Sequence, residues 1–317
     1  MNTLDFFDVE VRSMTREATG ILSLTLHHPL GEPLPPWKPG AHLDLLLPNG
    51  KLRQYSLCSQ PTDPYWRIAV LHENESRGGS EFIHQELRPG SKIQVRQARN
   101  TFTLGPAKEY LFIAGGIGIT PILPMVREVA DSGAPWRLLY LGRTRPAMAF
   151  LDEIPADANV IVYARDGGER YPLAELLEEA KDLQAHVYVC GPAGLLDDVQ
   201  SLTRNWHRDR LHYERFAADT TTAPPAAVAE GSFEVELSDG ALVEVPAGTS
   251  ILEALEEAGR APLSSCREGI CGTCETQVIS GEIEHRDTLL SDAERAAGDT
   301  MMICVSRCRS KRLVLNI

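Results

Sequence analysis

The 317-residue sequence lacks the segments that direct a protein to a membrane or anchor it there. Its acidic beginning, residues 1–5, has neither the basic start nor the apolar core of a secretory signal peptide. The longest apolar stretch, residues 110–125, is interrupted by three glycines and two prolines, whereas a membrane-spanning helix needs about 20 largely apolar residues in succession. We therefore expect a cytoplasmic protein with no membrane partner.

The sequence also has fewer basic than acidic residues. It contains 31 Lys and Arg against 44 Asp and Glu, a net charge of −13, and no basic stretch that could displace counterions from a nucleic acid. We therefore expect no nucleic-acid partner. Residues 232–317 hold 15 acidic and 8 basic residues, a net charge of −7. This excess either keeps the protein soluble or steers it toward a basic surface on a redox partner.

Four of the seven cysteines have the spacing of a plant-type 2Fe–2S ferredoxin. Cys266, Cys271 and Cys274 form C-x4-C-x2-C, and Cys304 follows after 29 intervening residues. Glycines between the first three cysteines allow the backbone to wrap tightly, so that its N–H groups can point at the cluster sulfurs. The spacing therefore predicts a 2Fe–2S cluster and an electron carrier.

Other uses of these cysteines fit the sequence less well. Structural zinc sites usually contain two C-x-x-C pairs, and this sequence has one. An odd number of cysteines and the missing signal peptide disfavour a disulfide framework. A Rieske centre would need two histidine ligands in place of cysteines. Cys308, four residues after Cys304, stays open as an alternative fourth ligand.

The four cysteines lie in a separate C-terminal domain. A stretch rich in Thr, Ala and Pro within residues 219–231 predicts a linker. Beyond it, two alternating segments joined by Ser-Asp-Gly predict a hairpin. A helix follows over residues 251–258, capped by Thr249 or Ser250. Two strands, a helix and a cysteine loop predict a ferredoxin-like β-grasp domain over residues 232–317.

The rest of the chain divides into two patterns. Residues 1–105 contain short alternating segments separated by Pro and Gly, with one helical segment near 81–87, which predicts an antiparallel Greek-key barrel. In residues 106–218, apolar strands alternate with helices, which predicts an α/β domain with a parallel sheet. The expected helices of this domain cover residues 121–131, 172–181 and 193–206. The predicted fold is therefore multidomain, α/β plus β.

The first strand of the parallel sheet runs into glycines, which are Gly115, Gly116 and Gly118. Thr120 and Pro121 then predict the N-cap and first residue of a helix. Such a turn lets a pyrophosphate approach the helix N-terminus. A later strand ends at Cys190 and Gly191, and open α/β sheets bind ligands at the carboxyl ends of their strands. Because the G-x-G-x-x-G fingerprint is missing, a plain tight turn is the alternative.

Two further motifs lie in the barrel. R-Q-Y-S at residues 53–56 falls on a predicted strand, where alternation places Arg53 and Tyr55 on one face and the other two residues on the opposite face. R-G-G-S at residues 77–80 forms a glycine turn that opens a helix, with an arginine beside it to pair with an anion. The second motif therefore predicts another phosphate site.

The combination of R-Q-Y-S, R-G-G-S, G-G-I-G-I-T-P, C-G-P and the C-terminal cysteine spacing resembles the phthalate dioxygenase reductase and vanillate O-demethylase reductase family. The resemblance covers nearly the whole chain, in the order flavin, nicotinamide and ferredoxin domain. The motifs of the first two domains are shared by the broader ferredoxin–NADP reductase superfamily. The domain order and the R-G-G-S motif are more discriminating, and they imply FMN instead of FAD.

The resemblance also implies roles for individual residues. Arg53 would pair with the FMN phosphate, Tyr55 would pack against the isoalloxazine, and Ser56 would form a hydrogen bond near flavin N5. Thr120 would reach the flavin from the nucleotide domain, and Phe216 would cover the flavin face that nicotinamide must approach. Tyr55 and Phe216 could instead be ordinary packing aromatics.

The remaining implied FMN residues are Gln54, Val70, Leu71, His72, Arg77, Gly78, Gly79 and Ser80. The implied NAD residues are Gly115, Gly116, Gly118, Cys190 and Gly191. The implied catalytic residues are Ser56, Cys190 and Phe216. The implied cluster ligands are Cys266, Cys271, Cys274 and Cys304.

The activity implied by the resemblance is that of an NADH-dependent reductase. It would pass electrons through FMN and the 2Fe–2S cluster to the Rieske-type oxygenase component of an aromatic ring-hydroxylating or O-demethylating system. We expect a monomer that forms a transient complex with this component. Another acceptor, such as a cytochrome P450, and a non-catalytic redox sensor are the alternatives. Arg143 and Arg145 leave NADPH open as a donor, because guanidinium groups there could bind a 2′-phosphate.

Overall fold

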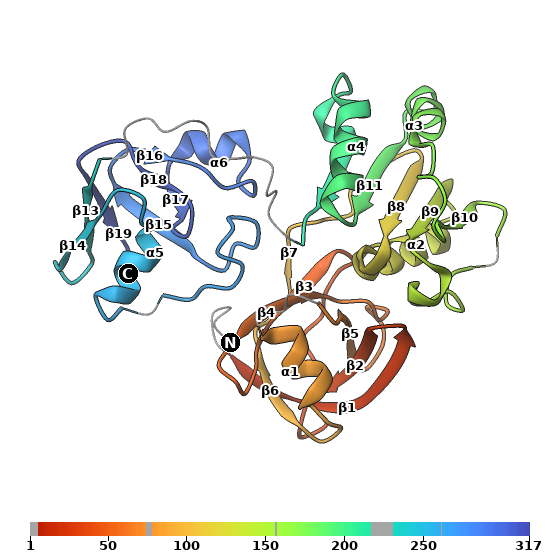
Figure 1. The fold of residues 1–317 in the computed structure, drawn as a ribbon, viewed down its shortest axis with the longest axis horizontal. Coiled ribbons are helices and arrows are strands. Elements are labelled where there is room, and N and C mark those ends of the chain that lie inside the picture. Colours follow the sequence, from red (N-terminus) through yellow and green to blue (C-terminus); the bar gives the residue numbers. More distant parts are fainter. Residues whose placement is uncertain (1–5, 74–77, 156, 217–230, 261) are drawn as a thin grey trace. The chain divides into compact units, whose positions relative to one another are not determined.

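The computed structural model describes residues 6–73, 78–155, 157–216, 231–260 and 262–317. The chain divides into two compact units, Met1–Phe216 and Ala217–Ile317, and each is described by itself (Figure 1). Most of the predicted linker lies outside the described residues. The predicted boundary between residues 105 and 106 stays a prediction, because the first unit contains both sides of it.

The first unit begins with an antiparallel sheet in the order β4-β3-β6-β1-β2-β5, with β7 paired to β3. A bridge between Leu57 and Ile68 joins the end of β4 to β5, so the two outer strands of this order meet and the sheet closes into a barrel. Apolar residues on alternate positions fill its interior. The predicted antiparallel Greek-key barrel is confirmed. Its elements are β1 (Phe7–Ala18), β2 (Ile21–His27), β3 (Ala41–Leu46), β4 (Leu52–Ser56), β5 (Trp66–Leu71), α1 (Gly79–Gln85), β6 (Lys92–Val95) and β7 (Arg99–Asn100).

The same unit continues into a parallel sheet in the order β10-β9-β8-β11-β12. Helix α2 packs on one face of this sheet and helices α3 and α4 on the other, which explains why its central strands are apolar on both sides (Figure 1). The predicted α/β arrangement is confirmed. Its elements are β8 (Tyr110–Gly115), η1 (Gly116–Gly118), α2 (Ile119–Ser132), β9 (Trp136–Gly142), η2 (Arg145–Ala147), β10 (Val160–Ala164), α3 (Leu173–Asp182), β11 (His186–Cys190), α4 (Ala193–Thr203), η3 (Arg208–Arg210) and β12 (Leu211–Glu214).

The start of helix α2 differs from the prediction. The helix begins at Ile119 and its N-cap is Gly118, so the prediction of Thr120 as N-cap and Pro121 as first residue is wrong. The preceding 3-10 turn continues directly into the helix, and the Thr120 hydroxyl donates a hydrogen bond back to the Ile117 carbonyl over 3.0 Å. Thr120 therefore supports the turn from inside the helix.

The barrel and the parallel sheet share one hydrophobic core. Ala18, Ile21 and Cys58 of the barrel pack in the same cluster as Phe112 and the α2 residues. A backbone hydrogen bond from Thr19 N–H to the Pro146 carbonyl, 2.8 Å long, also joins the two parts. The first unit therefore places the carboxyl edge of the parallel sheet in a fixed relation to the barrel.

The second unit has a five-stranded sheet in the order β14-β13-β19-β15-β17 and a small β16-β18 ladder. Ser250, and not Thr249, caps helix α5, with Glu253 completing a capping box. The predicted hairpin and helix are confirmed, and so is the ferredoxin-like plan of this unit. Its elements are β13 (Phe233–Leu237), β14 (Leu242–Val245), α5 (Ile251–Glu257), β15 (Glu275–Ser280), β16 (Ile283–Glu284), α6 (Asp292–Ala297), β17 (Thr300–Met302), β18 (Arg307–Cys308) and β19 (Arg312–Leu315).

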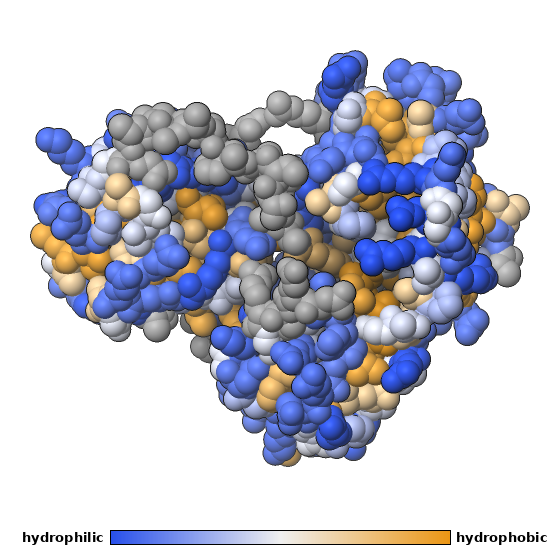
Figure 2. All heavy atoms as spheres, viewed as in Figure 1, coloured by the Kyte–Doolittle hydropathy of each residue, from blue (hydrophilic) through white to orange (hydrophobic). Residues whose placement is uncertain are grey.

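Hydrophilic residues cover much of the face shown in Figure 2, where hydrophobic side chains form separate patches on each unit. None of the helices among the described residues has both the length and the apolar character that crossing a bilayer requires.

Candidate functional site

The structure brings the R-Q-Y-S and R-G-G-S motifs together. The side chain of Arg53 on β4 lies directly against Gly79 at the start of α1. A β carbon on Gly79 would lie only 2.5 Å from Arg53 Nε. Gly78 has a left-handed φ of 82° that turns the chain into the helix, and its carbonyl accepts a hydrogen bond from Asn49 over 2.9 Å. A guanidinium beside a turn that has no side chains of its own fits a phosphate group.

The predicted phosphate site also includes Ser80 and Arg77, the outer residues of the R-G-G-S motif. Ser80 is buried, and its Oγ accepts a hydrogen bond from the Glu73 N–H over 3.3 Å. Arg77 lies outside the described residues. Their predicted contacts with the phosphate stay predictions.

Tyr55 and the end of β5 flank this site. The half-buried Tyr55 packs against the barrel core, and burial raises the pKa of its hydroxyl, which is therefore neutral at physiological pH. Val70 and His72 have backbone groups with protein partners: the Val70 carbonyl is 3.0 Å from His84 Nε2, and the His72 N–H donates to Gly20 over 2.8 Å. Leu71 pairs with Ile21 in the barrel sheet. Flavin contacts from these residues stay predictions.

Gln54 points away from the phosphate site. Its side-chain amide donates to Asp44 Oδ1 over 2.8 Å, and Arg99 donates to both Asp44 oxygens over 2.9 and 3.0 Å. Asp44 is almost fully buried, so these partners are what keeps its charge tolerable there. The structure therefore gives Gln54 a place in a barrel network, and its predicted cofactor contact is untested.

A polar cluster forms where the barrel meets the parallel sheet. Ser56 Oγ donates to Glu214 Oε2 over 3.5 Å, and His42 Nδ1 lies 3.9 Å from Glu214 Oε1. Glu214 ends strand β12 and its side chain is 12% exposed. Burial raises the pKa of Glu214 to about 8, so that the carboxyl holds a proton at neutral pH. Burial, reinforced by the Arg99 guanidinium, lowers the pKa of His42 to about 4, so the imidazole is neutral.

Cys190 borders this cluster, because it pairs with Glu214 across the β11–β12 ladder. Cys190 is fully buried, and burial raises the pKa of its thiol well above the usual value, with the Glu214 carboxyl adding to the effect. The thiol is therefore protonated, so it can pack against a ligand but cannot act as a nucleophile. Sequence reasoning missed Glu214 and His42. The available signal was an acidic residue at the carboxyl end of a buried parallel strand.

The glycines at the carboxyl edge of the parallel sheet, where the sequence predicts nucleotide binding, allow two backbone turns to pack against each other. A β carbon on Gly118 would lie 2.2 Å from the Cys190 carbonyl oxygen, and one on Gly115 would lie 3.3 Å from Gly191 Cα. The turns that end β8 and β11 therefore touch, as the sequence predicts for one ligand edge. Gly116 has a left-handed φ of 55° and nothing within 4 Å of a built β carbon, so its outer side is open.

Thr120 and Phe216 differ in exposure. Thr120 is 2% exposed and bonded to its own turn, whereas Phe216, two residues after the end of β12, is 42% exposed. An exposed aromatic next to Glu214 fits the predicted cover of a flavin face, which stays a prediction. Arg215, between Glu214 and Phe216, donates hydrogen bonds to Asp197 over 2.9 Å and to Gln200 over 2.7 Å.

The four predicted cluster ligands come together in the second unit. The thiol of Cys266 is close enough to those of Cys271 and Cys304 to interact with them, and the same holds for Cys274 and Cys304. All four are buried. The Glu268 N–H donates to Cys266 Sγ over 3.3 Å, the kind of backbone contact that a thiolate bound to iron accepts. The cysteines therefore fit a 2Fe–2S cluster.

Cys308 has a different partner. Its sulfur contacts Ser310, at 3.0 Å from the carbonyl and 3.1 Å from Oγ. Within the described ranges, no three or more His, Cys, Asp or Glu side chains are arranged to hold a single metal ion. A 2Fe–2S cluster divides its four thiolates between two irons. These observations favour Cys304 over Cys308 as the fourth ligand.

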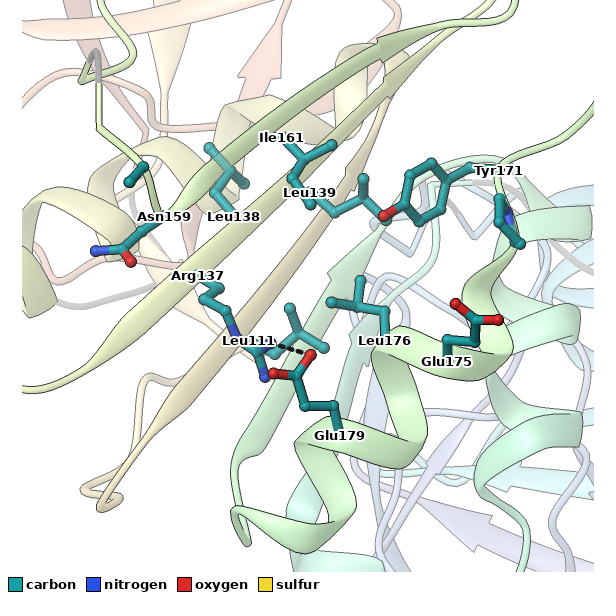
Figure 3. A pocket seen from close by; sticks show the side chains of 12 residues that line it. Leu111, Arg137, Leu138, Leu139, Asn159, Ile161, Tyr171, Glu175, Leu176 and Glu179 are labelled. Carbon is teal, nitrogen blue, oxygen red and sulfur yellow. Dashed lines mark ion pairs between the residues drawn. The ribbon is translucent and has the colours of Figure 1, made fainter.

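A pocket of about 240 Å³ lies elsewhere in the first unit (Figure 3). It is bordered by α3 and by the beginnings of β9 and β10, whereas the glycine turns follow the ends of β8 and β11. Arg137, one of the residues that line it, pairs with Glu179 over 2.7 Å, as the dashed line in Figure 3 marks. This pocket is therefore distinct from the nucleotide edge.

Two segments of the chain match known domain families. Residues 235–309 match the 2Fe-2S iron-sulfur cluster binding domain, and residues 112–201 match the oxidoreductase NAD-binding domain. Each match covers the part of the chain where the corresponding site has been described.

Similar proteins cover nearly the whole chain. Vanillate O-demethylase oxidoreductase of Pseudomonas sp. (strain HR199 / DSM 7063) is 40% identical over 98% of this chain and 99% of its own. Phthalate dioxygenase reductase of Burkholderia cepacia is 39% identical over 98% of each chain. A solved phthalate dioxygenase reductase, described as transferring electrons from pyridine nucleotides to [2Fe-2S], matches at 38% identity with a TM-score of 0.72, over 98% of both chains. An intact type IV self-sufficient cytochrome P450 monooxygenase matches at 42% identity and a TM-score of 0.87, over 98% of this chain and 41% of that one.

Proposed function

Because the chain belongs to the family of phthalate dioxygenase reductase and vanillate O-demethylase oxidoreductase, we propose that it is the reductase component of a multicomponent oxygenase system. It takes electrons from NADH and passes them through FMN and a 2Fe–2S cluster to the oxygenase component, which oxidises an aromatic compound. The observation that supports this most strongly is the meeting of four buried cysteines in one unit, while the other unit holds glycine turns for a nucleotide.

The cofactors supply the redox chemistry and the protein supplies binding and orientation. When bound, FMN would supply the exchange of two electrons with NADH and of single electrons with a 2Fe–2S cluster. Arg53 and the Gly78–Gly79 turn would hold the FMN phosphate, since the guanidinium already lies against the turn. The contacting turns at Gly118 and Gly191 would hold the pyrophosphate of NADH.

Ser56, Cys190 and Glu214 form the polar wall of the flavin site. Glu214 holds a proton at neutral pH, and Ser56 orients its carboxyl through the 3.5 Å hydrogen bond. Cys190 adds a buried neutral thiol beside them. These groups therefore present neutral hydrogen-bonding atoms to a bound flavin and nicotinamide, without a fixed charge that would oppose hydride transfer.

The oxygenase component binds transiently, and the chain acts as a monomer in the cytoplasm. The acidic composition of residues 232–317, with a net charge of −7 from 15 acidic and 8 basic residues, supports docking on a basic surface. A P450 is the second candidate acceptor, because 98% of this chain matches 41% of a self-sufficient P450, and the TM-score of the match is 0.87. The first candidate is preferred because vanillate and phthalate relatives match from end to end.

The test is anaerobic reduction of purified acceptors. The protein should contain FMN, iron and acid-labile sulfide, and NADH should bleach both the flavin and the cluster absorbance. With NADH present, it should then reduce a Rieske-type oxygenase of this class at a rate that falls as salt is added. Reduction of a P450 alone would favour the second candidate, and a protein without iron and sulfide would contradict both.

A further inference from the structure

The segment that follows β16 touches both cysteine-bearing parts of the second unit. The Thr288 N–H donates to the carbonyl of Gly269, between Cys266 and Cys271, over 3.2 Å. The Arg286 N–H donates to Oγ of Ser306, two residues beyond Cys304, over 3.2 Å. Residues 286–288 therefore link two ligand segments that are distant in the sequence.

Asp287 lies at the centre of this link and is only 3% exposed. Its Oδ2 accepts hydrogen bonds from the Leu289 and Leu290 N–H groups over 3.2 and 2.9 Å. Its Oδ1 accepts a longer one, 3.4 Å, from Ser306 Oγ. A carboxylate that is buried this deeply persists only with such partners.

The loop between Cys266 and Cys271 packs closely against Asp287. Gly269 has a left-handed φ of 71°, and a β carbon there would lie 3.1 Å from Asp287 Cα and 2.6 Å from Val305 Cγ2. Only glycine therefore allows the loop to approach this closely. The close approach places the carboxylate-bearing residue directly behind the loop that presents Cys266 and Cys271.

Two side chains that could balance the charge of Asp287 do so incompletely. Arg295 Nη2 lies 3.6 Å from Oδ2 and donates to the Asp287 carbonyl over 2.5 Å, and this arginine is about one-third exposed. His285 Nδ1 lies 3.6 Å from Oδ1, but its buried ring nitrogens have no hydrogen-bond partner among the described residues. A negative charge thus stays close to the cluster loop, where water screens it poorly.

We propose that Asp287 is a positioning residue for the 2Fe–2S site. Its carboxylate holds the segment 286–288, which links the Cys266–Cys271 loop to the Cys304 segment, and its buried charge lowers the reduction potential of the cluster. The role depends on the cluster assigned under the proposed function. Reduction adds an electron to the site, and a nearby fixed negative charge opposes that addition. Asp287 would then make the reduced cluster a stronger donor to the oxygenase component.

The test is the D287N variant of the full-length protein, loaded with FMN and cluster. The amide keeps the size of the carboxyl and can offer its oxygen to the Leu289 and Leu290 N–H groups, and its NH2 to Ser306 Oγ. The expected result is a more positive midpoint potential of the cluster, equivalent to about a tenfold change in the reduction equilibrium, or about 59 mV for one electron. The flavin potential and NADH–ferricyanide activity should not change.

D239N is the matched control, because Asp239 carries the same charge on the exposed hairpin between β13 and β14. Its loss should leave the cluster potential at the wild-type value, because water screens exposed charges. A wild-type potential in D287N would overturn the role of the charge. Equal shifts in D287N and D239N would also overturn it, because the effect would then be one of net charge alone.

The S306A variant tests the link between the two ligand segments without removing a charge. Loss of the Ser306 hydroxyl removes the hydrogen bond to Asp287 Oδ1 and the acceptor for the Arg286 N–H. Iron should then be released to a chelator about fivefold faster than from the wild type. D287N combined with S306A should release iron no faster than S306A alone, since the amide in D287N keeps the hydrogen bond with Ser306. Wild-type release from S306A would overturn the link, whereas a wild-type protein without iron and sulfide would contradict the proposed function itself.

Discussion

Ser56 donates a hydrogen bond to Oε2 of Glu214 over 3.5 Å, although the two residues lie 158 positions apart in the sequence. Ser56 ends a barrel strand, and Glu214 ends a strand of the parallel sheet. The contact therefore exists only because both parts pack on one hydrophobic core. It connects the residue predicted to contact the flavin with a carboxyl whose protonation depends on burial.

Replacing Glu214 should change how stability depends on pH. Burial raises the pKa of Glu214 from 4.5 to about 8. Between these values the folded protein keeps a proton that the unfolded chain releases, so the wild type loses stability as pH rises through this range. E214Q cannot release a proton, and its stability should exceed that of the wild type by roughly 3 kcal/mol at pH 7, with almost no difference near pH 4.5. Urea unfolding at several pH values measures both curves.

A surface variant separates this effect from a general loss of acidic charge. Glu175 is exposed at the start of α3, so E175Q should follow the wild-type curve at every pH. If the free energy of unfolding changed with pH in the same way in E214Q and the wild type, Glu214 would not be protonated in the folded protein. The rate of flavin reduction by NADH should also lose any inflection near pH 8 in E214Q.

Removing one cluster ligand should separate the two electron-transfer steps. C274S should lose the 2Fe–2S absorbance and reduce cytochrome c or an oxygenase only at background rate, because the remaining three thiolates cannot complete the site. NADH–ferricyanide activity should remain, since that acceptor takes electrons from the flavin. C308S is the control and should keep both activities, because the Cys308 sulfur contacts Ser310. Equal loss of both activities in C274S, with FMN still bound, would contradict this order of electron flow.

Adding one methyl group at Gly79 should weaken FMN binding. The β carbon would lie 2.5 Å from Arg53 Nε and 2.6 Å from its Cγ, so the guanidinium would have to leave its position. G79A should raise the Kd for FMN about tenfold, in keeping with the loss of a charge-assisted hydrogen bond. R53A should weaken binding similarly, and the double variant should be little worse than either. G231A, which meets no atom within 4 Å, should bind FMN like the wild type.

The cluster site and the type of each domain were predictable, because both leave motifs of residues that lie close together in the sequence. The contact of Gly118 with Cys190 was partly predictable, since parallel strands align their carboxyl ends. The pairing of His42 and Ser56 with Glu214 was not, because it depends on how two sheets pack. The start of α2 was mispredicted at Thr120, since its hydroxyl bonds backward to Ile117 instead of capping the helix.

The Arg67–Glu153 ion pair should hold the barrel against the parallel-sheet part. Arg67 on β5 donates two hydrogen bonds of 2.7 Å to Glu153, and Arg127 on α2 donates a third of 2.6 Å. These arginines lower the pKa of Glu153 despite the opposing effect of burial. E153Q leaves two guanidinium groups without their counter-ion, and should lower the free energy of unfolding by about 3 kcal/mol at pH 7.

The pH dependence supplies a second check on Glu153. A carboxyl whose pKa is lowered on folding stabilises the protein above its unfolded value of 4.5, and that contribution disappears as pH falls through the folded value. The difference between wild type and E153Q should therefore shrink in acid. E128Q changes an exposed carboxyl on α2 and should match the wild type. Equal stability of E153Q and E128Q would show that the shared hydrophobic core alone joins the two parts.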